Sequence, residues 1–173
     1  MSVPFQRISN ATIADIQFYD PAAERRAASL QVNWDDYFAV GSQEILYQLE
    51  FGWWNKYCDT VFGSTYYKNN SQGQLVTAFD PSKLVKSDQT LVRLDVYHAT
   101  LTFYESLVTD VSNLNEVDIG NYEFAKKRYD NEWTKALQLM NFYDLYGDGL
   151  PITKLEENWT ADVDYFNNDR RYF

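Results

Sequence analysis

The residues best suited to nucleophilic or acid–base chemistry are the only histidine, His98, and the only cysteine, Cys58. A Ser-His-Asp or Cys-His catalytic set would have to include His98. Asp95 and Thr102 stand within one helical turn of it, but such neighbours arise by chance in a polar sequence. We interpret His98 as a core or interface histidine and Cys58 as a buried, unreactive thiol.

Metal chemistry finds little support in the residue types. A structural zinc site needs four ligands of the Cys or His type, which one chain of this composition cannot supply. The string 144–149 (DLYGDG) has the spacing of the start of a calcium loop. However, Tyr146 occupies the third position and Leu155 the twelfth, where oxygen ligands are required. We interpret its glycines as a helix stop, which Pro151 reinforces.

The remaining catalytic patterns are equally weak. Paired carboxylates occur at 35–36 and 156–157, but such pairs are expected in a chain with 25 acidic residues. The sequence contains no GxGxxG, Walker or GxSxG motif, one of which a cofactor-dependent enzyme usually carries. We therefore predict no catalytic, cofactor-binding or metal-binding residues, no cofactor and no enzymatic activity.

Composition narrows the class of protein further. Aromatic residues make up 17% of the 173 residues, and the formal net charge is −10. Without a local basic stretch, that charge argues against binding to a phosphate backbone. No apolar run reaches the roughly 18 residues of a membrane span, and Met1–Ser9 lacks a secretory pattern. We expect one soluble, compact domain with extended ends, of an intracellular or virion protein.

The first half of the chain predicts helices. Residues 1–19 are of mixed composition, with a short strand or a helical turn near their end, and we interpret them as an N-terminal arm. Asp20-Pro21 is typical of a helix start, because Asp accepts free N–H groups and Pro fits the first helical position. A stronger helix begins near Asn33 or Ser42 and runs to about 58. Gly41 either interrupts this helix or allows another helix to approach closely.

The second half predicts a pair of long helices. Residues 64–79 have strand-like composition around a run of turn formers, which indicates a small inserted β-hairpin. A helix from Ser87 or Asp88 to about 110, and another over about 121–143, carry apolar stripes at helical spacing. We expect these two to form an antiparallel helix hairpin. The fold class is thus mainly α: a helical bundle over 20–149.

Residues 150–173 lack periodicity and are interpreted as an extended C-terminal arm. The arm is rich in aromatic residues, which argues for docking on the core or on a partner. Its last residues are basic, and arginine binds carboxylates in a bidentate manner. The predicted docking residues of the arm are Trp159, Tyr165, Phe166, Arg170, Arg171, Tyr172 and Phe173.

Aromatic residues outside the arm are further candidates for contacts. Tyrosine and tryptophan are enriched where proteins touch one another. The predicted subunit-interface candidates are Trp53, Trp54, Tyr66 and Tyr67. A carbohydrate platform around Trp53 stays open as an alternative.

This layout resembles the head-to-tail adaptor proteins of tailed bacteriophages, also called connector, head-completion or neck proteins. The resemblance lies in the segment 79–84 (FDPSKL), the helix 91–110 with Val96-Tyr97-His98, and 122–129 followed by 143–149 (YDLYGDG). It covers roughly residues 34–173, whereas Met1–Gln31 finds no counterpart.

The resemblance implies a homo-oligomeric ring, typically of twelve subunits, in the neck of a virion made in the host cytoplasm. The C-terminal arm would dock on the portal protein, and the ring would meet the tail, or a tail-terminator or nozzle protein. DNA would pass through without sequence-specific binding, and no membrane would be involved. An acidic lumen is compatible with this, because it repels DNA. The alternative is a small soluble module that binds a sugar or peptide through surface aromatics.

Overall fold

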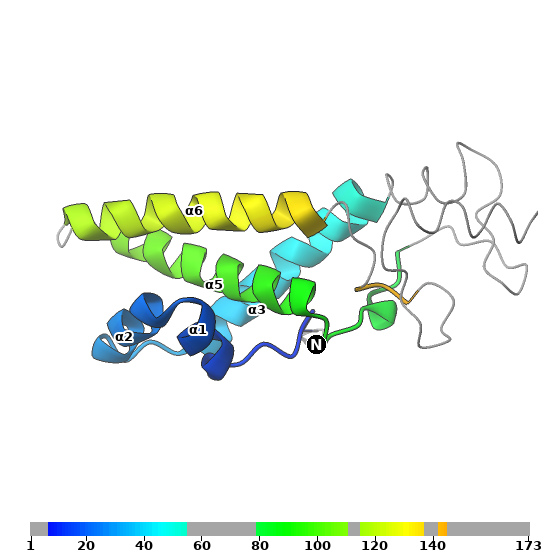
Figure 1. The fold of residues 1–173 in the computed structure, drawn as a ribbon, viewed down its shortest axis with the longest axis horizontal. Coiled ribbons are helices and arrows are strands. Elements are labelled where there is room, and N and C mark those ends of the chain that lie inside the picture. Colours follow the sequence, from blue (N-terminus) through cyan, green and yellow to red (C-terminus); the bar gives the residue numbers. More distant parts are fainter. Residues whose placement is uncertain (1–6, 55–78, 111–114, 137–141, 145–173) are drawn as a thin grey trace, which may run out of the picture. The chain divides into compact units, whose positions relative to one another are not determined.

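The computed structural model describes residues 7–54, 79–110, 115–136 and 142–144 (Figure 1). These residues are mainly helical and form no strand. The described residues belong to two compact units, which divide the chain as Met1–Leu46 with Lys86–Lys135 and Tyr47–Val85 with Ala136–Phe173. The predicted β-hairpin at 64–79 and C-terminal arm at 150–173 lie outside the described residues, apart from residue 79.

The helices are α1 (Ile13–Tyr19), α2 (Pro21–Ser29), α3 (Trp34–Gln48), α5 (Gln89–Thr109) and α6 (Glu116–Ala136). A π-helical turn, η1 (Leu49–Trp53), continues α3, and a 3-10 turn, η2 (Pro81–Lys83), precedes α5. The prediction of a mainly α protein is confirmed. Within the described residues, no helix has both the length and the apolar character needed to cross a membrane.

The short helices α1 and α2 begin at polar residues that bond to the free N–H groups. A carboxylate oxygen of Asp15 accepts hydrogen bonds from the backbone N–H and the hydroxyl of Thr12, both at 2.8 Å. At α2, Asp20 accepts from the N–H of Ala23 at 3.0 Å, and Pro21 is the first helical residue. The Asp20-Pro21 helix start is confirmed, and a helix replaces the strand considered for the first arm.

Helix α3 runs unbroken through Gly41 and packs against α5. Asn33 precedes it and accepts from the N–H of Asp35 at 3.2 Å, so Asn33 rather than Ser42 begins the helix. A Cβ atom at Gly41 would stand only 2.8 Å from Nδ1 of His98. The glycine therefore permits close approach of the two helices and does not interrupt α3.

Helix α5 is the central element of the first unit. Asp88, one of the two predicted starts, caps it by accepting from the N–H of Thr90 at 2.7 Å. Its buried side chains include Leu91, Leu94, Val96 and Phe103, which lie on several sides of the helix. Trp34 and Phe38 of α3, together with alanines of α2, complete the core around it.

Helix α6 lies beside α5 (Figure 1). The guanidinium of Arg93, near the start of α5, bonds to Glu132, near the end of α6, at 2.6 Å. The expected bounds of about 121–143 are wrong, because α6 spans Glu116–Ala136 and residues 142–144 are not helical. Asn115 caps it there, accepting from the N–H of Asp118 at 2.7 Å. The connection at 111–114 lies outside the described residues, so the hairpin stays a prediction.

The second unit has an aromatic cluster. Trp53 and Trp54 contact the rings of Phe79 and Tyr143, at centroid distances between 5.3 and 6.5 Å. Tyr143 also forms an antiparallel bridge with Leu84, the residue after η2. These rings pack residues from three distant parts of the chain into one small core.

Candidate functional site

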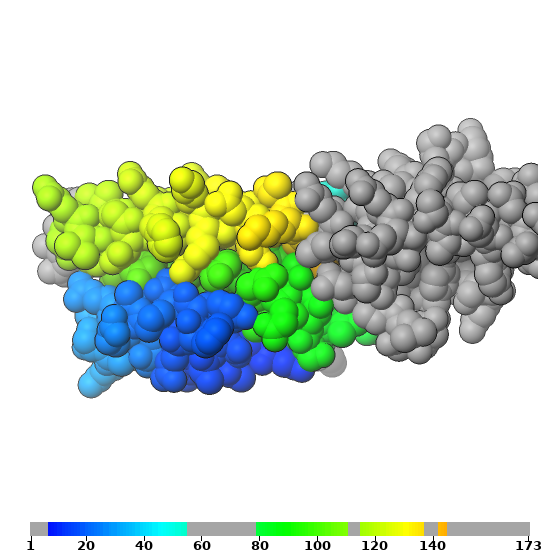
Figure 2. Space-filling model, viewed as in Figure 1, coloured from blue at the N-terminus to red at the C-terminus, as the bar shows by residue number. Residues whose placement is uncertain are grey.

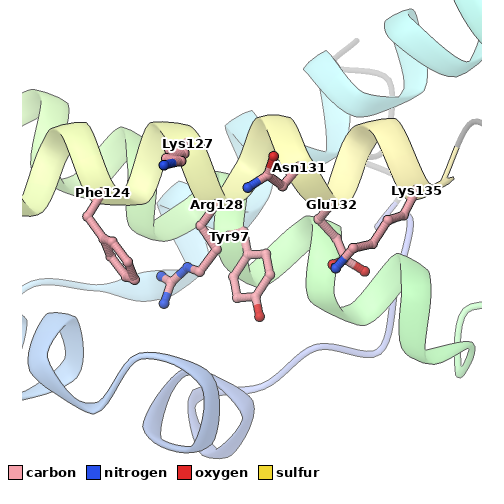
Figure 3. A pocket seen from close by; sticks show the side chains of 7 residues that line it. All are labelled: Tyr97, Phe124, Lys127, Arg128, Asn131, Glu132 and Lys135. Carbon is pink, nitrogen blue, oxygen red and sulfur yellow. The ribbon is translucent and has the colours of Figure 1, made fainter.

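A groove on the surface of the first unit is the candidate site (Figure 3). It encloses about 280 Å³, and all of its lining residues except Tyr97 of α5 come from α6. The lining residues are Tyr97, Phe124, Lys127, Arg128, Asn131, Glu132 and Lys135. In the space-filling view, α6 (yellow) and the blue α1–α2 region stand on either side of α5 (Figure 2). Six of the lining residues belong to α6. They recur at steps of three and four residues, which places their side chains on one face of that helix.

Arg128 forms the inner wall of the groove. Its guanidinium pairs with the carboxylate of Asp20 and donates to the carbonyl oxygen of Tyr19 at 3.2 Å. It also lies over the ring of Tyr97, 4.4 Å from the centroid. Arg128 thereby ties α6 to α5 and to the junction of α1 and α2. Because its charge is used within the fold, it positions the groove and is not free for a ligand.

Glu132 is the buried carboxylate of the groove, with 5% of its side chain exposed. It accepts from Arg93 at 2.6 Å and lies 3.6 Å from the ammonium of Lys135. Burial lowers the pKa of Arg93, but the hydrogen bond and the charge of Glu132 outweigh it and raise the pKa overall. Glu132 is therefore engaged chiefly by Arg93, and Lys135 is the more distant partner.

The outer part of the groove is positively charged. The side chain of Lys135 is 66% exposed, and Lys127 makes no ion pair among the described residues. The lining includes three cationic side chains and one carboxylate. In a chain of net charge −10, such a local excess of positive charge is a feature that requires an explanation.

Aromatic rings extend from the groove across the surface. The rings of Phe18 and Tyr19 meet edge to face at 4.9 Å, and those of Tyr19 and Tyr97 at 5.9 Å. Phe124 lies on the other side of Arg128, 5.4 Å from ring centroid to guanidinium. Phe18 is 78% exposed and Phe124 64% exposed. We call these four rings the aromatic rim, an apolar surface that adjoins the cationic groove.

His98 lies in the interior, as the sequence predicted. It is buried, and its Nε2 is 2.6 Å from a carboxylate oxygen of Glu44 in α3. Thr102, one turn further along α5, is 3.4 Å from Nδ1. No serine or cysteine nucleophile contacts the ring among the described residues. The contact between His98 and Glu44 joins α3 to α5. Asp95, one turn before His98 on α5, bonds to other residues.

Asp95 anchors the N-terminal segment to α5. Its buried carboxylate accepts from the hydroxyl of Ser9 at 2.6 Å and lies 3.4 Å from the guanidinium of Arg7. Burial raises the pKa of Asp95 to about 6, against the opposing effects of Ser9 and Arg7. Arg7 also lies over the ring of Phe38, 4.3 Å from its centroid. The segment is thus held by charge, hydrogen bonds and an aromatic ring.

The predicted contact residues fall into two groups. Trp53 and Trp54 are 1% and 4% exposed and belong to the aromatic cluster of their own unit. Their surface is therefore used within the chain. Outside the described residues lie Cys58, the tail of the calcium-like string, and the interface and docking candidates Tyr66, Tyr67, Trp159, Tyr165, Phe166, Arg170, Arg171, Tyr172 and Phe173. No group of three or more metal-binding side chains occurs within the described parts.

Sequence reasoning missed the groove, although two of its signals were visible. Lys127, Asn131 and Lys135 recur on the side of the helix opposite its apolar stripe, a pattern that by itself indicates only a solvated face. Phe124 stands off the apolar stripe of α6, on that same polar face, and could have marked it as a contact surface. The ion pair between Arg128 and Asp20 joins residues 108 apart in the chain, which periodicity alone does not reveal.

Comparison with known proteins adds no identification. No protein-family model matches this chain, and neither a curated protein nor a solved structure matches it.

Proposed function

We propose that the protein is a non-enzymatic structural component of a tailed-phage virion. In this proposal it is a head-to-tail adaptor that forms a homo-oligomeric ring, typically of twelve copies, between the portal and the tail. DNA passes through the ring without sequence-specific contacts. The acidic composition of the chain supports this role, because a wall of like charge repels the DNA phosphates.

The observation that carries the proposal is the exposed aromatic rim. Phe18 and Phe124 are 78% and 64% exposed, and burying each ring against a partner would gain roughly 2 kcal/mol. Adjacent exposed rings are typical of surfaces that another protein covers. Other large apolar side chains, including Val117 at 70% and Ile119 at 37%, are also exposed on α6. Burial of these groups between subunits would account for their exposure in the single chain.

The finer architecture belongs to the same proposal. We infer that α5 and α6 form an antiparallel hairpin, consistent with the bond between Arg93 and Glu132 at opposite ends of the two helices. In the proposed ring, a β-hairpin near 64–79 and an arm from 150 to 173 make contacts beyond the helical unit. The arm docks on the portal, and the opposite side of the ring meets a tail or tail-terminator protein.

The alternative, a small module that binds a sugar or peptide through the region of Trp53 and Trp54, is less well supported. Both indoles are buried against rings of their own unit, whereas stacking on a sugar requires an open aromatic face.

Removal of Asn158–Phe173 tests the role of the arm. We expect the truncated chain to keep its helical circular dichroism almost unchanged, because the described helices pack on one another through buried residues between Ala11 and Ala125. The truncated chain should no longer assemble into rings, as measured by light scattering and negative-stain microscopy. Loss of the helical signal on truncation would show that the segment belongs to the core and would contradict the arm.

The neck assignment has its own test. Gold-labelled antibodies against the chain, applied to tailed virions from cells that carry its gene, should mark the junction of head and tail. Labelling elsewhere on the particle, or none on particles with an intact neck, would refute the assignment.

A further inference from the structure

The groove side of α6 presents two lysines at a fixed spacing. Lys127 and Lys135 are eight residues apart, which is about 12 Å along a helix, and Asn131 stands midway between them. Lys127 makes no ion pair among the described residues, and Lys135 is 3.6 Å from a carboxylate that Arg93 holds at 2.6 Å. Phe124, 64% exposed, continues the same side of the helix. A partner that fits this surface carries two carboxylates at the same spacing, with an apolar side chain beside them.

Helix α3 presents the complementary pattern. Asp36 and Glu44 are exposed and eight residues apart, again about 12 Å, and Val40, 46% exposed, stands midway between them. Steps of four residues place these three side chains on one side of the helix. Asp36 makes no ion pair among the described residues. Glu44 contacts His98, but its side chain is 58% exposed and accessible to a second partner.

The two helix faces of one copy cannot meet each other. Helix α3 is tied to α5 by the contact between Glu44 and His98, and α6 is tied to α5 by the bond between Glu132 and Arg93. In Figure 1, α6 runs along one side of α5 and α3 crosses behind it. Since each helix turns its buried side toward α5, both exposed faces point away from the unit, and only another copy can bring them together.

We propose that α3 of one copy packs against α6 of a second copy, with Asp36 and Glu44 paired with Lys127 and Lys135. Because the two spacings match, Val40 lies opposite Asn131 whichever way the helices run. This inference rests on the proposed ring, because ring closure requires each copy to present two different, complementary surfaces. The face of α3 is one such surface, and the face of α6 is the other.

Cysteine crosslinking between differently tagged full-length copies tests the proposal. In a Cys58→Ser background, one copy carries Val40→Cys and the other carries Asn131→Cys, the two central positions. We expect mild oxidation to yield a disulfide-linked species that contains both tags, because the two Cβ atoms come within the short range that a disulfide spans. A matched copy with Asp130→Cys, exposed on α6 but outside the groove lining, should crosslink roughly fivefold less with Val40→Cys.

Crosslinking of Val40→Cys no stronger at 131 than at 130 would overturn the proposal, and so would the absence of any product that contains both tags. The neck labelling is independent of this measurement. A strong crosslink without neck labelling would refute only the virion assignment, whereas neck labelling without the crosslink would refute only the contact between α3 and α6.

Charge exchange provides a second measurement. Lys127→Glu or Lys135→Glu, each in the copy with Asn131→Cys, should reduce the crosslink roughly threefold, as expected for loss of one exposed ion pair. Asp36→Lys in the copy with Val40→Cys should restore the crosslink with one of these two variants and not with the other, which gives the direction of the paired helices. Restoration with neither variant would refute the pairing of these charges.

Discussion

The contribution of Asp95 to the free energy of unfolding falls as the pH rises. Its side chain is fully buried, and its pKa is raised by burial from 3.8 in the unfolded chain to about 6. The folded protein therefore keeps a proton that the unfolded chain releases at lower pH. Above about pH 6 the folded state must hold a buried negative charge, so the contribution of Asp95 to stability is present at low pH and lost between these two values.

The size of the effect follows from the shift. About two pKa units correspond to about 3 kcal/mol in total, of which roughly 1 to 2 kcal/mol is lost between pH 5 and pH 7.5. Asp95→Asn places a neutral group in the same volume and removes this titration. The free energy of unfolding of the variant, relative to wild type, should rise by roughly 1 to 2 kcal/mol over that interval.

Urea unfolding followed by circular dichroism at 222 nm measures this difference at the two pH values. Other carboxylates titrate over the same range, so only the difference between variant and wild type is informative. Asp130→Asn, which removes an exposed carboxylate from α6, controls for the change in net charge. If Asp95→Asn tracks wild type at both pH values, the buried carboxylate does not carry the shifted titration.

Two further predictions concern single side chains. Gly41→Ala forces a methyl group to within 2.8 Å of the ring of His98 and should lower the unfolding free energy by about 1 to 3 kcal/mol. Gly120→Ala, in open space on α6, should raise it by up to about 1 kcal/mol. Equal effects of the two substitutions in thermal melts would refute the close approach of α3 and α5. Asp20→Ala removes both a helix cap and the partner of Arg128, so about 3 to 5 kcal/mol should be lost. Asp20→Asn keeps the cap and should lose less in the same melts, and a loss equal to that of the alanine variant would argue against a role for the cap.

Local signals were predictable from the sequence and long-range pairings were not. The starts of α2 and α5 follow from Asp20-Pro21 and Asp88, because capping depends on residues within one turn. The start of α6 differs from the expected one because residues 116–120, although they carry few apolar side chains and a glycine, are helical. Its cap at Asn115 provides the local reason why the helix begins there.

The candidate site was unpredictable for a different physical reason. Glu132 is buried on α6, where composition alone indicates a solvated carboxylate, because Arg93 of α5 compensates its charge. That compensation depends on which residues of two helices meet, and helical periodicity carries no information about the partner. The same holds for His98, whose contact with Glu44 of α3 joins residues 54 apart.

The anchoring of Arg7 and Ser9 by Asp95 has a consequence for the order in which the protein acquires its structure during synthesis. The anchored residues leave the ribosome first, but their partner follows 86 to 88 residues later. At typical rates of translation, the amino-terminal end waits on the order of ten seconds before its binding place exists. Closure of such a long loop carries an entropic cost, so docking of this end should be a late step, after α3 and α5 have paired.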